Sequence, residues 1–213
     1  MNNIGSGDRS WHLIVAGLLA VAFVTNCSQP PLPENHYYRL GDAIPAVVHQ
    51  TPPIEGPVQV KTMRADGLAG QRPIVYSERE RPFEIRQYNY HYWYEAPPNM
   101  LQLQLIDYLS ASGASGVVKL PDSGGAGGCT VTGHIRRFER LVGDNKPSTV
   151  LVEMDLRLER LDYSMTLFAG SYRAETRLID EQMDDVVLAF NSAVTEIFDH
   201  FLKNLVDISA TCG

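Results

Sequence analysis

The chain has 213 residues, 44% of them hydrophobic, and a formal net charge of −7 at pH 7. This length and apolar content suit a single globular domain with one core. The negative charge argues against a nucleic-acid partner, because binding to a polyanion depends on Lys and Arg side chains that neutralise phosphates.

The N-terminal region has the layout of a bacterial lipoprotein signal peptide. Arg9 precedes an apolar run over residues 11–24, and the run ends shortly before Cys27. A secretory signal combines a basic start, an apolar core of about 7 to 15 residues and a cleavage site. We therefore predict that residues 1–26 are removed and that the thiol of Cys27 is acylated. A retained transmembrane anchor is the alternative, although a spanning helix needs about 20 apolar residues.

Acylation of Cys27 would attach the mature chain to a membrane outside the cytoplasm. Ser28 follows this cysteine, where retention at the inner membrane commonly uses Asp. We therefore predict a lipid-anchored, periplasm-facing protein of the outer membrane. Residues 27–35 are rich in proline and are predicted to form an extended tether. The folded domain is predicted to cover residues 36–213.

Two further cysteines remain once Cys27 is acylated, namely Cys129 and Cys212. In an oxidising compartment two such thiols can pair, so we predict a disulfide between them. The alternative is that both stay reduced, the first as a small strand residue and the second as a thiol of the C-terminal tail. A structural zinc site is not expected, because the chain lacks CxxC and paired-histidine spacings.

Apolar and polar residues alternate along much of the domain, as they do in half-buried strands. The predicted strands cover residues 37–40, 58–62, 72–76, 83–88, 130–141, 149–161 and 165–178. From Val150 to Leu158 the alternation gives one apolar and one charged face. The alternation within 130–141 changes phase, so a β-bulge is expected near Arg136 and Arg137.

Two helices are predicted, at about residues 99–111 and 184–207, and a glycine-rich loop is predicted over 113–128. In the second helix, apolar residues recur at intervals of three and four. Turns are expected at 143–147 and 162–164. The order of strands, helix, strands, helix predicts an α+β domain in which both helices pack on one face of a mainly antiparallel sheet.

The sequence carries no motif for catalysis or for a cofactor. GxSxG, HExxH and Walker patterns are absent, and the glycine-rich tract lacks the GKS or GxGxxG pattern of a phosphate-binding loop. The six histidines are scattered along the chain. We therefore expect a protein that is not an enzyme and that uses no metal or cofactor.

One short segment is unusually rich in aromatic residues. Five such side chains lie within seven residues: Tyr88, Tyr90, Tyr92, Trp93 and Tyr94. Tyr and Trp are favoured at interfaces because each combines a large apolar area with a polar group. We predict that this segment forms a surface for a protein or lipid partner. The alternatives are that alternate rings pack in the core, or that the rings stack on carbohydrate.

The order of several short motifs resembles the ABC-type transport auxiliary lipoprotein family. The motifs are Tyr-Tyr-Arg-Leu at 37–40, Val-Gln-Val at 58–60, Gly-Leu-Ala-Gly-Gln-Arg-Pro-Ile-Val-Tyr at 67–76 and Trp-Tyr-Glu-Ala-Pro-Pro at 93–98. Segments 135–139 and 168–170 and the terminal helix extend the resemblance over most of residues 36–207.

The resemblance implies a non-catalytic subunit of an Mce-type transport system. In such a system an inner-membrane permease and a cytoplasmic ATPase work with a periplasmic Mce-domain protein to move phospholipids or other hydrophobic molecules between membranes. These proteins are the implied partners, and self-association as a homo-oligomer is a further expectation. A different function stays open, that of a stand-alone envelope lipoprotein that binds a lipid or a glycan in its own pocket.

Overall fold

The structure is a computed structural model that describes residues 31–121, 127–143, 147–161 and 165–212. The chain divides into a unit Met1–Glu34 and a compact unit Asn35–Gly213. The predicted signal peptide, Cys27, the predicted turn at 162–164 and most of the one at 143–147 lie outside the described residues. In the described part of the chain, no helix is long and apolar enough to cross a membrane.

The compact unit contains strands, two α-helices and a short 3-10 helix. The strands are β1 (His36–Tyr38), β2 (Val58–Val60), β3 (Arg64–Ala65), β4 (Pro73–Glu78), β5 (Arg81–Trp93), β6 (Val118–Lys119), β7 (Cys129–Val142), β8 (Thr149–Arg160) and β9 (Met165–Arg177). The helices are η1 (Gly67–Gly70), α2 (Pro97–Ala111) and α3 (Met183–Asp207). Both predicted α-helices are confirmed and begin slightly earlier than predicted. β6 lies within the predicted glycine-rich loop.

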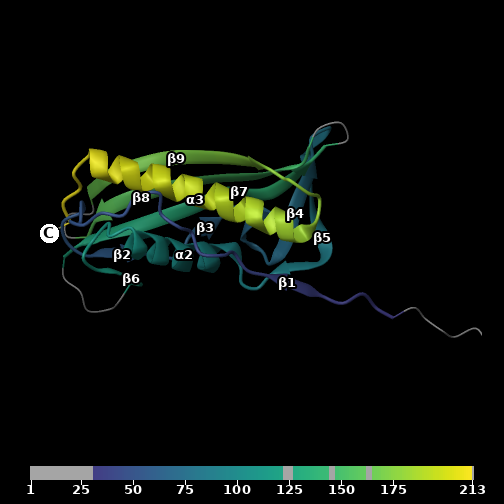
Figure 1. The fold of residues 1–213 in the computed structure, drawn as a ribbon, viewed down its shortest axis with the longest axis horizontal. Helices are drawn as coiled ribbons and strands as arrows, with labels where there is room; N and C mark the ends of the chain where they lie inside the picture. Colours follow the sequence, from purple (N-terminus) through teal and green to yellow (C-terminus); the bar gives the residue numbers. More distant parts are fainter. Residues whose placement is uncertain (1–30, 122–126, 144–146, 162–164, 213) are drawn as a thin grey trace, which may run out of the picture. The chain divides into compact units, whose positions relative to one another are not determined.

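The strands form one curled, mixed sheet (Figure 1) in which β7 is the shared central strand. Along one edge, β7 pairs with β8 in antiparallel register, and β8 pairs with β9 in the same way. Along its other edge, three short strands follow one another in parallel register, β2 first, then β3, then β4. β5 pairs antiparallel with β4, and β1 lies parallel to β5.

The prediction of a mainly antiparallel sheet is wrong, because three of the strands before α2, namely β2, β3 and β4, pair with β7 in parallel. Val75 of β4, for example, lies beside Glu139 of β7. A parallel neighbour needs a long crossover connection, and here that connection includes β5, α2 and their flanking loops. Alternation and turn signals report pairing between strands that are adjacent in sequence, so they do not reveal this arrangement.

The core lies between the inner face of the sheet and the two α-helices, with α3 lying across β8 and β9 (Figure 1). The alternation predicted for β8 is confirmed by its buried inward side chains, Val150, Val152, Met154, Leu156 and Leu158. The helices add large apolar side chains to the same cluster, Leu101, Leu105 and Leu109 from α2 and Phe190, Phe198 and Phe201 from α3. Each such buried side chain stabilises the fold by about 1.5–3 kcal/mol.

The predicted bulge in β7 is confirmed by a shift in its register with β8 between Ile135 and Arg137. One additional residue, Arg136, is accommodated there. As a result Ile135 and Phe138, which are three positions apart, are both buried in the core. A regular strand would place them on opposite faces.

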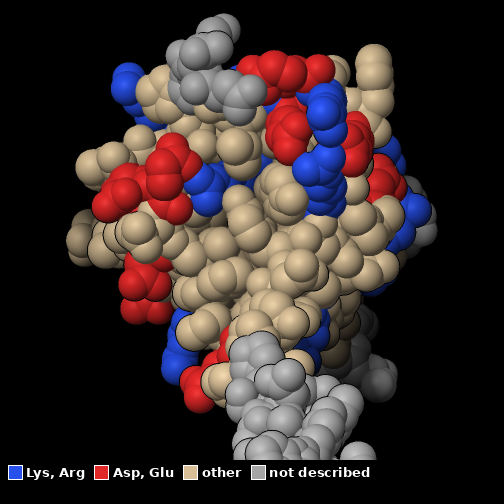
Figure 2. Space-filling view, turned by 90° about the vertical axis from the view of Figure 1, so that its right-hand side faces the viewer, with Lys and Arg blue, Asp and Glu red and all other residues tan. Residues whose placement is uncertain are grey.

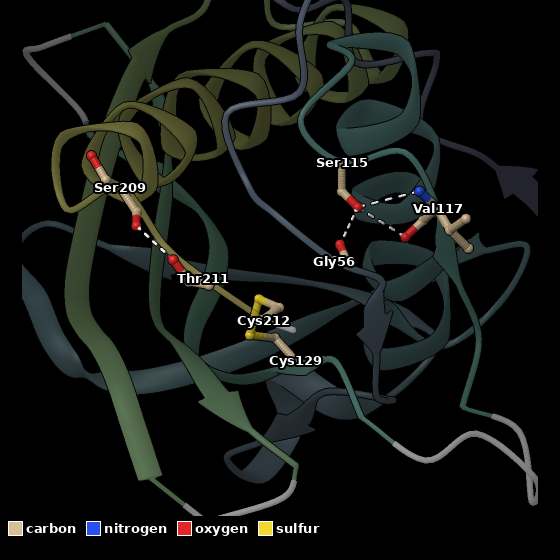
Figure 3. The surroundings of a disulfide bond; sticks show 7 residues. All are labelled: Gly56, Ser115, Val117, Cys129, Ser209, Thr211 and Cys212. Carbon is tan, nitrogen blue, oxygen red and sulfur yellow. Dashed lines mark hydrogen bonds between the residues drawn. A yellow bond between two sulfur atoms is a disulfide. The ribbon is translucent and has the colours of Figure 1, made fainter.

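A disulfide joins Cys129, the first residue of β7, to Cys212 near the C-terminus (Figure 3), with their Cα atoms 5.0 Å apart. Both cysteines are buried. The backbone N–H of Cys212 donates to the carbonyl of Glu55, and the N–H of Glu55 donates to the carbonyl of Ala210. The C-terminal segment is thus held against both β7 and the loop that precedes β2.

Candidate partner surface

The aromatic side chains at the end of β5 divide between the core and the surface. Trp93 is only 1% exposed, and its ring lies 5.4 Å from that of Phe138 and 5.1 Å from that of Phe190. The prediction that Trp93 belongs to a partner surface is therefore wrong. β5 is flanked by β1 and β4 at this point, and α3 covers its inner face, so the side chain of its last residue is enclosed.

The other predicted aromatic residues are half-buried or exposed. The Tyr88 ring lies 4.5 Å from that of Tyr76, and burial is the main cause that raises the pKa of Tyr88. The Tyr92 ring lies 5.8 Å from that of Tyr37 on β1. Tyr90 is 38% exposed. The Tyr88 and Tyr76 rings meet because β4 pairs with β5, and the Tyr92 and Tyr37 rings meet because β1 pairs with β5.

An irregular stretch in the pairing of β5 with β4 explains why the aromatic segment does not alternate between faces. Pro73 of β4 pairs with Tyr92, whereas Val75 pairs with Gln87, so β5 has several extra residues between these pairs. Tyr90 lies in this irregular stretch with a φ of 64°, in the left-handed region that bulky residues rarely adopt. Backbone strain of this kind is concentrated at functional sites.

Two histidines complete the cluster. The rings of His36 on β1 and His91 on β5 are stacked 5.3 Å apart, and the Tyr38 hydroxyl lies 3.0 Å from Nδ1 of His91. Burial, and in second place the charge of His36, lowers the pKa of His91. Burial also raises the pKa of Tyr38, as does the nearby carboxylate of Asp184. The uncharged form of the His91 ring is therefore favoured in the folded protein.

The ring contacts of these side chains fall into two groups, one of His36, Tyr88 and His91 and one of Tyr37 and Tyr92, which lie at adjacent positions of β1 and β5 and so face opposite sides of the sheet. We call these two groups together with Tyr90 the aromatic surface, and its residues are His36, Tyr37, Tyr88, Tyr90, His91 and Tyr92. Figure 2 looks onto the end of the domain where β1, β4 and β5 lie, and there the charged side chains surround a broad uncharged area. The guanidinium of Arg72 lies 5.3 Å from the centre of the Tyr37 ring at one point of this surface. A surface of rings with polar groups suits protein contact.

Tyr94, the last of the predicted aromatic residues, lies beyond the sheet. Its backbone N–H still donates to the carbonyl of Tyr38, but its side chain is 68% exposed and lines a groove beside α2. Within the described ranges, no group of three or more His, Cys, Asp or Glu side chains is placed to hold a metal ion.

The family model for the ABC-type transport auxiliary lipoprotein component matches residues 38–200. The chain belongs to the ABC-type transport auxiliary lipoprotein family. This match confirms the resemblance drawn from the short motifs. Proteins of this transport auxiliary family are envelope lipoproteins with an auxiliary rather than a catalytic part in transport.

Two solved structures share the fold of this transport auxiliary lipoprotein. A protein of Xanthomonas campestris from the domain family DUF330 has a TM-score of 0.70 and 16% identity, covering 81% of this chain and 95% of the other. A second, titled only as an uncharacterized protein, has a TM-score of 0.63 and 13% identity, covering 81% of this chain and 99% of the other. At such identities the likeness extends to the fold alone. A search of curated proteins gives no match.

The sequence predicted three residues of the aromatic surface, Tyr88, Tyr90 and Tyr92, but not His91 or the two residues that β1 contributes. His36 and Tyr37 belong to the aromatic surface through a pairing with β5 that joins positions 36 and 91. The Tyr-Tyr pair at 37–38 belongs to one of the family motifs, and nothing local in the sequence links it to β5.

Proposed function

We propose that this protein is the non-catalytic lipoprotein subunit of an Mce-type ABC transport system that moves phospholipids or other hydrophobic molecules across the bacterial envelope. The observation that carries the proposal is the family match over residues 38–200. The partners are then an Mce-domain periplasmic protein, a permease and an ATPase. Energy for transport would come from the ATPase, since this chain carries no nucleotide-binding motif.

The proposed anchor is the acylated Cys27, held in the outer membrane. Residues 27–35 then form the tether between the lipid and the compact unit. Nine extended residues span at most about 30 Å. The domain is thus kept within a short distance of the membrane surface, while the aromatic surface is free to meet a periplasmic partner.

The aromatic surface is the proposed contact for the Mce-domain protein or for a second copy of this chain in a homo-oligomer. Its support is the exposure of Tyr37 and Tyr90, at 55% and 38%, within a largely uncharged area. Aromatic side chains lose little conformational entropy on binding and often contribute 2 kcal/mol or more to an interface.

The partner contact can be tested with the double variant Tyr37→Ala/Tyr90→Ala. Its affinity for the Mce-domain protein encoded beside this gene should fall by about 30-fold or more, the equivalent of a 2 kcal/mol loss. Phe83→Ala is the matched control, because Phe83 is 99% exposed but lies outside the aromatic surface. A folded double variant that binds like the wild type would contradict the assignment, and the absence of Mce, permease and ATPase genes nearby would count against the transport system itself.

A further inference from the structure

A groove beside α2 lies apart from the aromatic surface and has the chemistry of a ligand site. It has a volume of about 560 Å³ and runs between the irregular segment 39–45 and one face of α2. Met100, Leu103, Gln104, Asp107 and Ala111 line it from the helix. Small-molecule sites commonly enclose about 300–1,000 Å³. The opposite face of α2 is buried in the core.

The groove is held open by hydrogen bonds to both helices. The side-chain amide of Gln104 donates to the carbonyl of Gly41 at 2.7 Å and to Oδ1 of Asn191 on α3 at 2.9 Å. Asn191 in turn donates to the carbonyl of Asp42, and Asp199 accepts from the N–H of Ala46. Segment 39–45 is therefore fixed in place, and the groove exists before any ligand arrives.

Its apolar lining is exposed to solvent to an unusual degree. Ile44 is 77% exposed, Tyr94 68% and Leu103 45%, and all three line the groove. Covering this apolar area with a hydrocarbon chain would contribute about 25 cal/mol to the free energy of binding for each Å² removed from water. An alkyl chain is the ligand part that suits this lining.

A buried acceptor in the groove wall has no donor. Gln104 is only 7% exposed, and both of its amide hydrogens are used in the contacts to Gly41 and Asn191. Its Oε1 atom is buried without a hydrogen-bond partner among the described residues. An unsatisfied buried acceptor costs about 1–3 kcal/mol.

The charges at the groove indicate the polar part of the ligand. Three carboxylates, of Asp42, Glu95 and Asp107, face one guanidinium, that of Arg39. None of these four exposed side chains forms an ion pair with another described residue. The excess of carboxylates favours an ammonium group and disfavours a ligand with a net negative charge. The guanidinium of Arg39 is the one cationic group in the groove lining that a phosphate could contact.

We propose that this groove binds an amphiphile of the phosphoethanolamine lipid class. The alkyl chain lies along Ile44, Leu103 and Tyr94, the ammonium group lies against the carboxylates, and the phosphate lies near Arg39. A peptide fits less well, because it would bring backbone groups that need partners, while the carbonyls of Gly41 and Asp42 are already engaged. This site goes beyond the proposed function, because lipid binding in the groove needs none of the proposed transport partners.

The test uses the mature chain with Cys27→Ser, exported by a cleavable signal peptide in place of residues 1–26. Equilibrium dialysis against lysophosphatidylethanolamine and lysophosphatidylglycerol of equal chain length, both below their micelle concentrations, should show at least about tenfold tighter binding of the first. Equal affinities, or no binding of either lipid, would overturn the proposal. Displacement of the bound lipid by a soluble Lys-rich amphipathic peptide of higher affinity would also overturn it and assign the groove to a protein.

Two variants locate the binding in the groove. Leu103→Gln should lower the affinity for lysophosphatidylethanolamine by about tenfold. Glu95→Gln/Asp107→Asn should remove most of the preference for this lipid over lysophosphatidylglycerol. Glu80→Gln/Asp207→Asn is the matched control, because it removes two exposed carboxylates that lie outside the groove. If the two groove variants keep their fold, as judged by thermal melting, and bind both lipids like the control, the groove is not the site.

Discussion

Trp93 and Tyr94 are neighbours in the sequence but have opposite roles. The first is enclosed by Phe138 and Phe190, whereas the second is 68% exposed. Trp93→Ala should therefore lower the free energy of unfolding by about 3–5 kcal/mol, and Tyr94→Ala should change it by less than about 0.5 kcal/mol. Urea unfolding of both variants measures the difference. Equal stabilities would mean that Trp93 is not a core residue.

His91 makes stability depend on pH in a predictable direction. Its pKa is lowered in the folded state, mainly by burial and then by the charge of His36, so the unfolded chain takes up the proton first. The stability that the neutral ring contributes is complete above the ordinary His pKa of about 6.5 and is lost as the pH falls through the window below it.

Unfolding curves at pH 7.5 and pH 5.5 measure this dependence. His91→Gln should lose a smaller part of its stability on acidification than the wild type, whereas His200→Gln, at an exposed position of α3, should behave like the wild type. Identical losses in all three proteins would refute the role given to His91.

At the scale of elements, the disulfide ties together two segments 83 residues apart in sequence. In the chain-entropy account, closing a loop of this length stabilises a protein by about 4 kcal/mol, although measured values are often smaller. Cys129→Ser/Cys212→Ser should therefore lower the melting temperature by several degrees. Peptide mapping under non-reducing conditions tests the pairing in protein isolated from the envelope. Two free thiols there would disprove it.

The elements differ in how far the sequence could predict them. α3, the alternation of β8 and the bulge at Arg136 follow from periodicity, which is a local property of the chain. The parallel pairing of β2, β3 and β4 with β7 joins segments that are distant in the sequence. The composition of the aromatic surface depends on pairings of the same distant kind. The burial of Trp93 and the joining of His36 to His91 both depend on which strands flank β5, and no spacing along the chain reports that.

At the scale of the whole molecule, the proposed anchor gives a prediction about location. Cys27→Ser should leave the precursor without acyl chains and release the protein from the membrane fraction, because the only proposed attachment is the lipid on that thiol. Ser28→Asp is the companion variant and should keep its lipid but move from the outer to the inner membrane. Membrane fractionation with mass spectrometry of the N-terminal peptide measures both. An unlipidated wild type that still partitions with the membrane would instead support a retained helix.

The shared strand β7 also sets the order in which the molecule can form. A chain that emerges with its N-terminus first presents β2, β3 and β4 well before residues 129–142, against which they must pair. Until then, β4 and β5 can pair with each other, because they are adjacent in sequence, but β2 and β3 have no such partner. Unpaired strands are prone to wrong association. β7, β8 and β9 pair with their neighbours in sequence, and such pairings form faster than those between distant segments. The last half of the chain to be synthesised is therefore the template on which the first half folds.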